Sequence, residues 1–331
     1  MRRILLTTVI VAVTAGMVAF GLSAYADSRA DREGAAPVAE ADLATVQDQP
    51  RIVFRSTAPG DAYGTVAMVP LADPAGPRAL TGVVCDRIDV AGAHASCLRT
   101  VRGVLTTFEA DLYDTDWNRI RSWPLPGIPS RTRLSDDGMM LTSTAFVTGH
   151  SYAAGGFSTQ TTVHALTPGA ADPGDIELFD LIVDGAPLRA ADRNMWGVTF
   201  LSGDEFYATA ASGDRTWLVH GDFSARTLTA VRENVECPAI SPDRTRIAFK
   251  KDRGDRQWGI AVLDLATGEE TVLPETRSVD DQPEWLDDHT VLYGLAREGE
   301  PGASDVWSLD VASGSAPELL IPQAWSPSVV R

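Results

Sequence analysis

The side chains of this sequence that could do chemistry are charged groups that pair with one another, and they do not belong to a catalytic motif. Only two lysines occur, at Lys250 and Lys251, and two adjacent acids, Asp280 and Asp281, follow them in the chain. Amines and carboxylates of this kind form ion pairs and attract charged partners. The motifs of zinc peptidases, serine hydrolases, dinucleotide-binding folds, P-loops and dithiol oxidoreductases do not occur in the sequence. These residues therefore favour electrostatic binding over catalysis.

Metal-binding patterns are equally sparse. The five histidines are scattered singly, without the close spacing of many zinc sites, at His94, His150, His164, His220 and His289. Residues 114–118, Asp-Thr-Asp-Trp-Asn, carry oxygen ligands at alternate positions like the start of a calcium loop. However, Arg119 stands where that loop needs glycine, and Leu125 stands where it needs glutamate. We expect a turn between strands at 114–118, and we expect no metal site and no cofactor.

Three cysteines allow one intramolecular disulfide. In an oxidising compartment we expect the pair Cys85 and Cys97, because they flank a turn at 91–93 on strands that should be adjacent, and strand neighbours can meet disulfide geometry. Nothing near Cys237 suggests a nucleophile. We therefore expect Cys237 to be a small buried hydrophobic residue.

The strongest signal in the sequence is an internal repeat near the C-terminus. Residues 237–249 and 259–273 form one unit, and the same layout returns about 45 positions later at 282–293 and 305–321. Apolar and β-branched residues alternate over short runs that end at Pro-Asp, Asp-Asp or Thr-Gly, which predicts four short strands in each unit. Units of this period and strand number predict a β-propeller, whose blades bury their faces only against one another.

Weaker copies of the pattern bring the number of units to six. They lie at 85–89, 134–141 and 200–207, with turns at 73–76, 114–118 and 222–225. Residues 51–54 already correspond to a second strand, whereas residues 324–330 resemble a bare first strand. We therefore predict an all-β fold, a six-bladed β-propeller of four-stranded antiparallel blades, in which the C-terminal strand completes the first blade. This pairing closes the ring and leaves no sheet edge at the seam.

The motif at 241–249, Ser-Pro-Asp-Arg-Thr-Arg-Ile-Ala-Phe, resembles the WD-like repeat of TolB-like propellers. Segments 196–200 and 279–282 resemble those of exported actinobacterial proteins of this type. The resemblance covers residues 51–331 by layout and roughly the last hundred residues in detail. It implies a periplasmic or secreted propeller that binds partners. It does not imply a place in a Tol-Pal complex, because residues 27–50 are too few to form the additional N-terminal α/β domain of TolB itself.

Propeller topology assigns the candidate binding residues to one face. The turns after the first and third strands of each blade lie on one face, and the loop after the second strand and the link to the next blade lie on the other. We predict an exposed contact site on this second face, formed by Lys250, Lys251, Asp280, Asp281, Glu236, Arg193 and Trp196. An ion-pair network that only stabilises blade contacts explains these residues equally well. The glycine-rich stretch 148–157 is a binding loop or, as we favour, a surface insertion.

The N-terminus predicts export. Arg2 and Arg3 precede an uncharged run, 4–26, that ends in Ala-Tyr-Ala, which is the layout of a secretory signal. The run also reaches the length of about 20 residues that spans a bilayer, so an uncleaved anchor is the alternative. We assign residues 1–26 to a signal peptide or membrane-anchor helix, 27–50 to a disordered tether and 51–331 to the propeller. The protein is then secreted or associated with the cell envelope, and it contacts the membrane only through residues 4–26 if these are not cleaved.

Charge excludes one class of partner. The net charge is −17, and it becomes −19 when residues 1–26, with two arginines and no acid, are removed. Such a chain repels phosphate backbones, so nucleic acid is not an expected partner. We predict a monomeric, non-catalytic module that binds a protein, a ligand or another cell-envelope partner. The alternative is a hydrolase or lyase with its active site in the central channel. A prolyl-oligopeptidase-like propeller is the weakest alternative, because it would need a hydrolase domain with a serine nucleophile.

Overall fold

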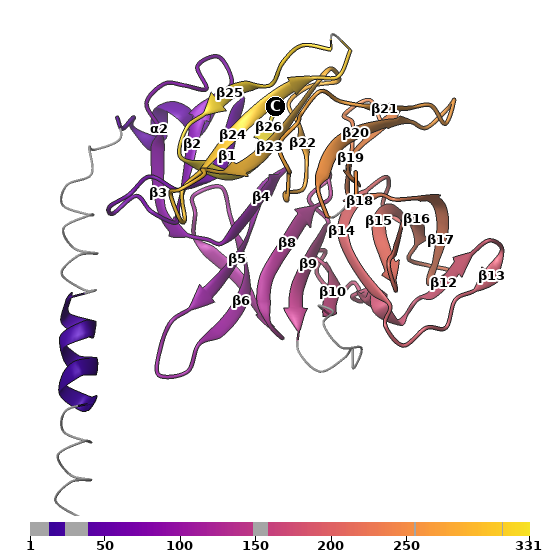
Figure 1. Cartoon of the computed structure of the whole chain (residues 1–331), viewed down its shortest axis with the longest axis horizontal. Coiled ribbons are helices and arrows are strands. Elements are labelled where there is room, and N and C mark those ends of the chain that lie inside the picture. The colour runs from indigo at the N-terminus through magenta and orange to yellow at the C-terminus, as the bar shows by residue number, and fades with distance from the viewer. Residues whose placement is uncertain (1–12, 24–38, 148–157, 255, 313) are drawn as a thin grey trace, which may run out of the picture.

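Six sheets form a ring like the blades of a propeller, and we call the axis of this ring the central channel (Figure 1). The computed structural model describes residues 13–23, 39–147, 158–254, 256–312 and 314–331. Within each blade the first strand lies next to the channel and the later strands follow outward. The predicted all-β, six-bladed architecture is confirmed.

The strand bounds follow the repeat units of the sequence. Blade 1 contains β26 (Ala324–Val330), β1 (Arg51–Ser56), β2 (Thr65–Pro70) and β3 (Ala79–Val84), and blade 2 contains β4 (Arg87–Ala91), β5 (His94–Val101), β6 (Thr107–Tyr113) and β7 (Arg119–Leu125). Blade 3 contains β8 (Ile128–Leu134), β9 (Met140–Val147), β10 (Ser158–Ala165) and β11 (Gly174–Asp175), and blade 4 contains β14 (Asn194–Phe200), β15 (Glu205–Ser212), β16 (Arg215–Asp222) and β17 (Thr227–Glu233). Blade 5 contains β18 (Glu236–Ile240), β19 (Arg246–Asp252), β20 (Trp258–Asp264) and β21 (Glu270–Val272), and blade 6 contains β22 (Glu284–Trp285), β23 (Thr290–Ala296), β24 (Ser304–Asp310) and β25 (Glu318–Ile321).

The C-terminal strand closes the ring as predicted. Strand β26 pairs antiparallel with β1, from Arg51 opposite Val330 to Ser56 opposite Ala324, with an irregularity between Val53 and Arg55. The first blade therefore combines the last strand of the chain with the first three, and β1 has a partner on both sides. This pairing removes the open sheet edge that the seam would otherwise present.

The turns after the first strands share one mechanism. In blade 5, Ser241 Oγ donates to Asp243 Oδ1 at 2.5 Å and accepts from Arg246 N–H at 3.0 Å. In blade 3, Ser135 Oγ makes the equivalent bonds to Asp137 Oδ1 at 2.5 Å and from Met140 N–H at 2.9 Å. Short polar side chains that bond the nearby backbone favour tight turns. The weaker copy at 134–141 is therefore a true equivalent of the clear one.

Blade 4 is larger than the repeat predicted. Strand β12 (Asp180–Val183) pairs parallel to β17, and β13 (Ala186–Pro187) pairs with β12, which gives a six-stranded sheet. The 3₁₀ helix η1 (Ile176–Leu178) begins this insertion between blades 3 and 4. Its Ile176 joins a buried cluster with Phe179, Leu181 and Phe206. The insertion therefore extends the hydrophobic core outward instead of looping into solvent.

The segment before the propeller differs from the expected tether from residue 39 onward. Helix α2 (Leu43–Val46) is capped by Asp42, whose side chain accepts from Ala44 N–H at 3.0 Å. Val46 is only 2% exposed and packs in the core shared by blades 1 and 2. Ala41 and Leu43 pack against the same core, and Ala41 N–H donates to the Arg78 carbonyl at 3.0 Å, so apolar and backbone contacts together dock a segment whose composition suggested disorder.

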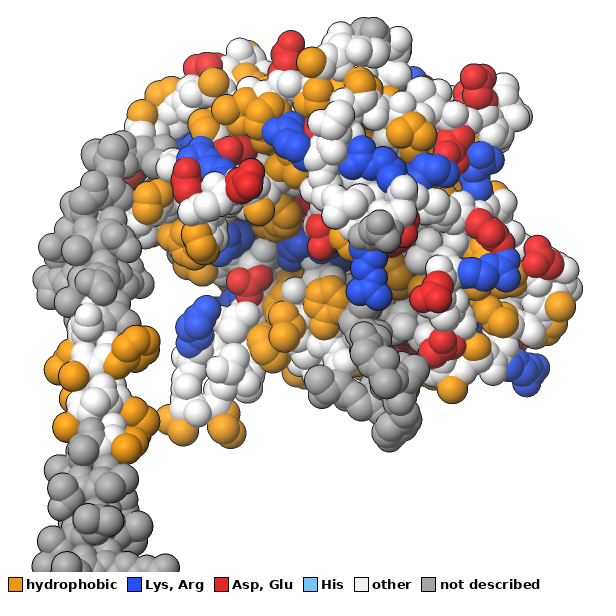
Figure 2. Space-filling view, in the orientation of Figure 1, with side chains coloured by type: hydrophobic (Ala, Val, Ile, Leu, Met, Phe, Trp, Pro, Cys, Tyr) orange, Lys and Arg blue, Asp and Glu red, His pale blue; other side chains and the backbone are white. Residues whose placement is uncertain are grey.

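Residues 13–23 form a helix whose large apolar side chains are exposed (Figure 2). In the part of the chain that the structure describes, no helix combines the length and the apolar character that a membrane crossing requires.

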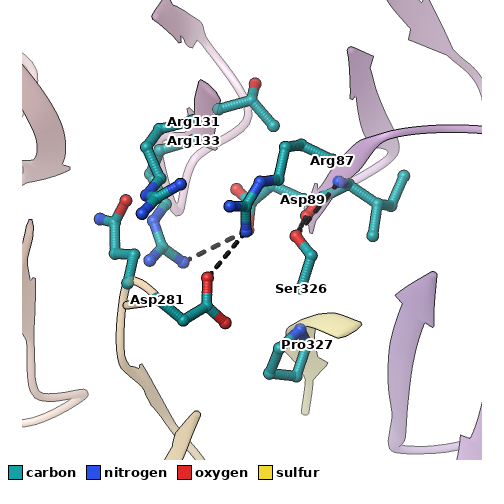
Figure 3. Close-up of a pocket in the computed structure, with 10 residues that line it drawn as sticks. Arg87, Asp89, Arg131, Arg133, Asp281, Ser326 and Pro327 are labelled. Atoms are coloured by element: carbon teal, nitrogen blue, oxygen red, sulfur yellow. Dashed lines mark hydrogen bonds and ion pairs between the residues drawn. The ribbon is translucent and has the colours of Figure 1, made fainter. Parts of the chain in front are cut away.

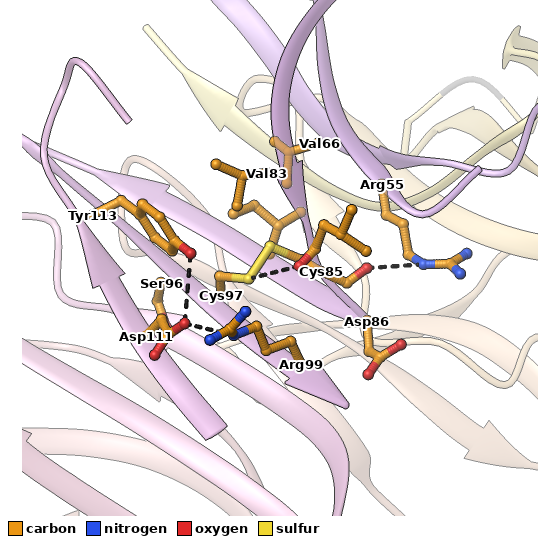
Figure 4. Close-up of a disulfide and its surroundings, with 12 residues drawn as sticks. Arg55, Val66, Val83, Cys85, Asp86, Ser96, Cys97, Arg99, Asp111 and Tyr113 are labelled. Atoms are coloured by element: carbon orange, nitrogen blue, oxygen red, sulfur yellow. Dashed lines mark hydrogen bonds and ion pairs between the residues drawn. A yellow bond between two sulfur atoms is a disulfide. The ribbon is translucent and has the colours of Figure 1, made fainter. Parts of the chain in front are cut away.

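The predicted disulfide is present. Cys85 and Cys97 are bonded, with their Cα atoms 5.5 Å apart (Figure 4). Cys85 lies in the link between β3 and β4 and not on a strand, so the bridge ties this link to the second strand of blade 2. Arg55 Nε donates to the Cys85 carbonyl at 2.9 Å, which adds a contact from blade 1. The bridge therefore fastens the junction between the first two blades.

Candidate binding site at the mouth of the central channel

The candidate site lies on the face that carries the links between blades and the loops after the second strands, which we call the link face. Its loops are residues 57–64, 102–106, 213–214, 253–257 and 297–303, apart from residue 255, which is not described. On the side of the molecule seen in Figure 2, acidic and basic side chains are interspersed over the propeller.

A small cluster of charged side chains lies inside the channel. It is built from the first strands of blades 1, 2 and 3 and from the link before blade 6. The space it encloses is about 20 Å³ and is lined by Arg87, Ile88, Asp89, Arg131, Thr132, Arg133, Asp281, Gln282, Ser326 and Pro327 (Figure 3). In β4 and β8 the charged residues stand two positions apart, because alternate side chains of a strand point to the same side. The lining holds three arginines although the protein is strongly acidic.

Arg87 is fixed by Asp281. Its Nη1 donates to Asp281 Oδ1 at 2.7 Å, and its guanidinium lies over the Trp325 ring, 4.9 Å from the centroid. Asp281 Oδ2 accepts from Gly294 N–H at 3.0 Å, and the Asp281 side chain is 1% exposed. Burial, together with the nearby Arg131, lowers the pKa of Arg87 to about 10, although Asp281 raises it. Both oxygens of Asp281 are thus engaged within the fold, so this predicted site residue has no acceptor left for a partner.

Arg133 bridges two buried acids. Its Nη1 lies 3.3 Å from Asp89 Oδ1 and also contacts the carboxylate of Glu284. Asp89 accepts two further hydrogen bonds, from Leu134 N–H at 2.6 Å and from Ser328 Oγ at 3.1 Å. Burial raises the pKa of Asp89 and of Glu284, while the charge of Arg133 opposes that rise. One guanidinium therefore holds together carboxyl groups from blades 2 and 6.

Arg131 has no such partner. Its Nη1 donates to the Ser130 carbonyl at 2.9 Å, and its guanidinium also interacts with the Cys237 thiol. Its buried Nε has no hydrogen-bond partner, and it forms no ion pair with an acid of the described residues. Burial by itself lowers the pKa of Arg131, but Cys237, Asp281 and Asp280 raise it, so that the net shift is upward. A charged guanidinium with unfilled donors therefore faces the channel.

Lys250 is buried, so the expectation of an exposed lysine is wrong at this position. Its side chain is 3% exposed, and its Nζ lies 2.6 Å from Asp280 Oδ1 and 3.7 Å from Glu236 Oε2. The same nitrogen lies over the Trp258 ring, 4.3 Å from the centroid, and Trp258 Nε1 donates to Glu236 Oε1 at 2.9 Å. The Asp280 side chain is 70% exposed. Of this group only Asp280 is available to a partner.

Lys251 points to the opposite side of β19, because neighbouring residues of a strand alternate. Its Nζ lies 2.7 Å from Glu270 Oε1, and Glu270 Oε2 accepts from Arg232 Nε at 2.9 Å. These three side chains join the outer strands of blades 4 and 5 to β19. The two lysines therefore do not form one site.

Trp196 lies inside the protein. It is 6% exposed and packs with Ala211 and Cys237. The Cys237 thiol is free and 1% exposed, which confirms the expected buried cysteine. Trp196 therefore supports blade packing and is not placed to contact a partner from outside.

Arg193 lines a second pocket, of about 250 Å³, between blades 3 and 4. Glu177 forms part of the same wall, and its Oε1 accepts from Thr159 Oγ1 at 2.9 Å and from Met195 N–H at 3.0 Å. Burial raises the pKa of Glu177 to about 8. Arg193 therefore lies apart from the channel cluster and lines a pocket with Glu177 instead.

Arg87, Arg131 and Arg133 were not among the predicted site residues. Their signal was present, since all three stand in the first strands of repeat units, where inward-facing positions alternate. They form no motif, however, and only the closing of the ring brings them together.

In the described segments no cluster of three or more potential metal-binding side chains is present. The turn at 114–118 has the expected form, because Asp114 Oδ1 accepts from the backbone N–H groups of Asp116 at 3.0 Å and Asn118 at 2.8 Å. The stretch 148–157, considered as a binding loop, lies outside the described residues.

Comparison with known proteins identifies the fold. No family model and no curated protein matches the chain. TolB from Acinetobacter baumannii superposes with a TM-score of 0.56 and 17% identity, over 85% of this chain and 66% of that one. A chain of a nidogen/laminin complex gives a TM-score of 0.53 and 10% identity over 85% and 98%, and a putative TolB from Agrobacterium tumefaciens gives 0.49 and 11% over 84% and 90%. The chain is therefore an all-β protein with a TolB-like, six-bladed propeller fold.

Proposed function

We propose that this protein is an extracytoplasmic, non-catalytic propeller that binds a cell-envelope partner at the link-face mouth of its channel. The observation that carries the proposal is the pairing of the charged groups there. The carboxylates of Asp89, Asp281 and Glu284 are engaged by arginines, whereas Arg131 has no carboxylate partner. Acid–base catalysis needs a carboxyl group placed to exchange a proton with a substrate. Binding needs donors that are not yet satisfied, and this mouth has them.

Export is supported by the N-terminal sequence and by cysteine chemistry. Residues 1–26 have the layout of a signal or anchor, and the Cys85–Cys97 bridge suits an oxidising compartment. A propeller from a nidogen/laminin complex, which is a protein–protein assembly, has a similar fold. We extend a protein-binding role to this chain because a propeller fold alone is compatible with many functions and the channel mouth favours binding.

A hydrolase or lyase acting in the channel is the second candidate. It is favoured by Asp89 and Glu284, two carboxyl groups beside one arginine whose pKa values are both raised by burial. Raised carboxyl pKa values occur at catalytic sites and also in structural ion-pair networks. Because Arg133 contacts both acids, we favour the structural role.

Photo-crosslinking in cells tests the proposal. A photoreactive amino acid is placed at Asp280, which is 70% exposed at the mouth, and, as a matched control, at Leu319, which is 48% exposed on the outer strand β25. We expect a discrete crosslinked species from position 280 and not from position 319, in the extracytoplasmic fraction. The species should be lost when Arg131→Gln is added.

Equal crosslinking from both positions, or a cytoplasmic protein, would contradict the proposal. Turnover of peptide, glycan or ester substrates that is abolished by Glu284→Gln would instead establish the enzymatic alternative.

A further inference from the structure

The channel mouth has more hydrogen-bond donors than its acids can satisfy. Asp281 uses one oxygen on Arg87 and the other on the Gly294 N–H, and Asp89 uses both oxygens on Arg133, Leu134 and Ser328. These acceptors are filled by groups of the fold. Arg87 uses one nitrogen on Asp281, and Arg131 donates to the Ser130 carbonyl and interacts with the Cys237 thiol. A guanidinium carries five N–H donors, so Arg87 and Arg131 both have donors that no acid of the described residues accepts.

The two guanidinium groups point into the same space beside Asp281 (Figure 3). Like charges at close range repel, and Arg131 accordingly lowers the pKa of Arg87. Each group is also held in place, Arg87 by Asp281 and Trp325, and Arg131 by the Ser130 carbonyl. Two fixed cations with unused donors form a site in which an anion would relieve the repulsion and satisfy the donors together.

We propose that Arg131 and Arg87 bind one carboxylate group presented by an extended polypeptide segment. The inference deepens the proposed function and rests on it, because it names the chemistry by which the partner is recognised. A carboxylate matches the planar, forked donors of arginine in two parallel hydrogen bonds. The segment that carries the carboxylate stays in the channel mouth, where Asp280 is exposed.

The site is small and partly open. Its volume is about 20 Å³, so a ligand enters it with a small terminal group while the rest of the ligand stays in the channel. A carboxylate can place its oxygens there while the rest of the chain remains outside. A phosphate group carries more negative charge than a carboxylate, and the net charge of −17 opposes polyanions. A single carboxylate is therefore the anion that the charge of the protein favours.

Fluorescence anisotropy tests the inference with a defined probe on the full-length chain. The probe is the peptide Gly-Ser-Gly-Gly carrying an uncharged dye at its N-terminus, in three forms: a free C-terminal carboxylate, a C-terminal amide, and an amide with one internal Asp. We expect saturable binding of at least one acidic form and affinity for the plain amide that is lower by about tenfold or more, as for loss of a charged hydrogen bond. The two acidic forms distinguish a terminal carboxylate from a side-chain carboxylate.

Matched variants locate the site. Arg131→Gln should weaken the acidic peptide by about tenfold or more, and Arg131→Lys should give an intermediate loss because the charge remains and the fork is lost. Arg102→Gln removes the same charge from an exposed loop of the link face and should change affinity less than about twofold. If Arg131→Gln does not fold, the wild type still tests the carboxylate site, through its affinities for the acidic and the amide peptides.

The outcomes separate this inference from the proposed function. Equal affinity for acid and amide, no saturable binding of either acidic form, or an equal loss in Arg102→Gln and Arg131→Gln would overturn the carboxylate site. Crosslinking from position 280 that persists in any of these cases would leave the binding function standing with a different chemistry. Arg131-dependent peptide binding without a crosslinked partner would support the carboxylate site and contradict the proposed function.

Discussion

Replacing each of the two adjacent lysines by methionine should have very different effects on stability. Lys250→Met removes a cation that is 3% exposed and contacts Asp280, Glu236 and the Trp258 ring. Lys251→Met removes one that is 26% exposed and contacts Glu270. Methionine keeps most of the aliphatic packing in both variants, so the difference between them reports the charge interactions.

The loss in free energy of unfolding depends on the acids that lose their cation in each variant. Breaking a fully buried ion pair costs about 3–5 kcal/mol because one charge stays buried without a partner. After Lys250→Met, Asp280 is 70% exposed and can be hydrated, but Glu236, 14% exposed, keeps only the Trp258 N–H. We therefore expect a loss of about 2–3 kcal/mol, below the fully buried case. After Lys251→Met, Glu270 still has Arg232 at 2.9 Å, and the expected loss is below about 1 kcal/mol.

Urea unfolding followed by tryptophan fluorescence measures the free energy of unfolding of both variants and the wild type under one condition. Losses for the two variants that agree within about 0.5 kcal/mol, or a larger loss for Lys251→Met, would refute the reasoning that strand alternation buries Lys250 and leaves Lys251 partly exposed.

Three further predictions concern the scaffold. Replacing Cys85 and Cys97 by serine should lower the free energy of unfolding by about 3 kcal/mol, from the chain-entropy cost of a separation of 12 residues, and the loss should vanish when wild type and variant are compared under reducing conditions. Deleting residues 324–331 should remove the pairing with β1 and abolish the cooperative thermal transition, and a truncated chain that melts like the wild type would contradict ring closure. Burial raises the pKa of Glu177 to about 8, above its value in the unfolded chain. As pH rises from about 5 to 8, the unfolded chain therefore loses this proton while the native protein keeps it, and the free energy of unfolding falls; below that range the stability is restored. Glu177→Gln should flatten this part of the pH–stability curve, and an unchanged curve would show that Glu177 ionises without cost.

The blade architecture could be read from the sequence because its causes are local. Alternation of apolar and polar residues, together with turn sequences such as Ser241-Pro242-Asp243, predicts the strands of the repeat units, whereas β12 and β13 lie in an insertion that the repeat does not contain. The missing first strand of the first unit and the surplus strand at the end identified the ring closure. Cys85 and Cys97 were close enough in sequence to predict their bridge, although the exact placement of Cys85 in a link needed the structure.

The candidate site was decided by tertiary structure. Arg87, Arg131 and Asp281 come from two first strands and one link, and no local pattern joins them. They meet only because the ring brings these segments around one channel, where burial and shared partners fix which charges are satisfied. Lys250 and Lys251 were predicted to share one contact site. Neighbouring residues of β19 instead point to opposite sides, and the packing of blade 5 buries Lys250. The sequence thus determined the blades and their order, and the closed ring determined which polar groups meet in its channel.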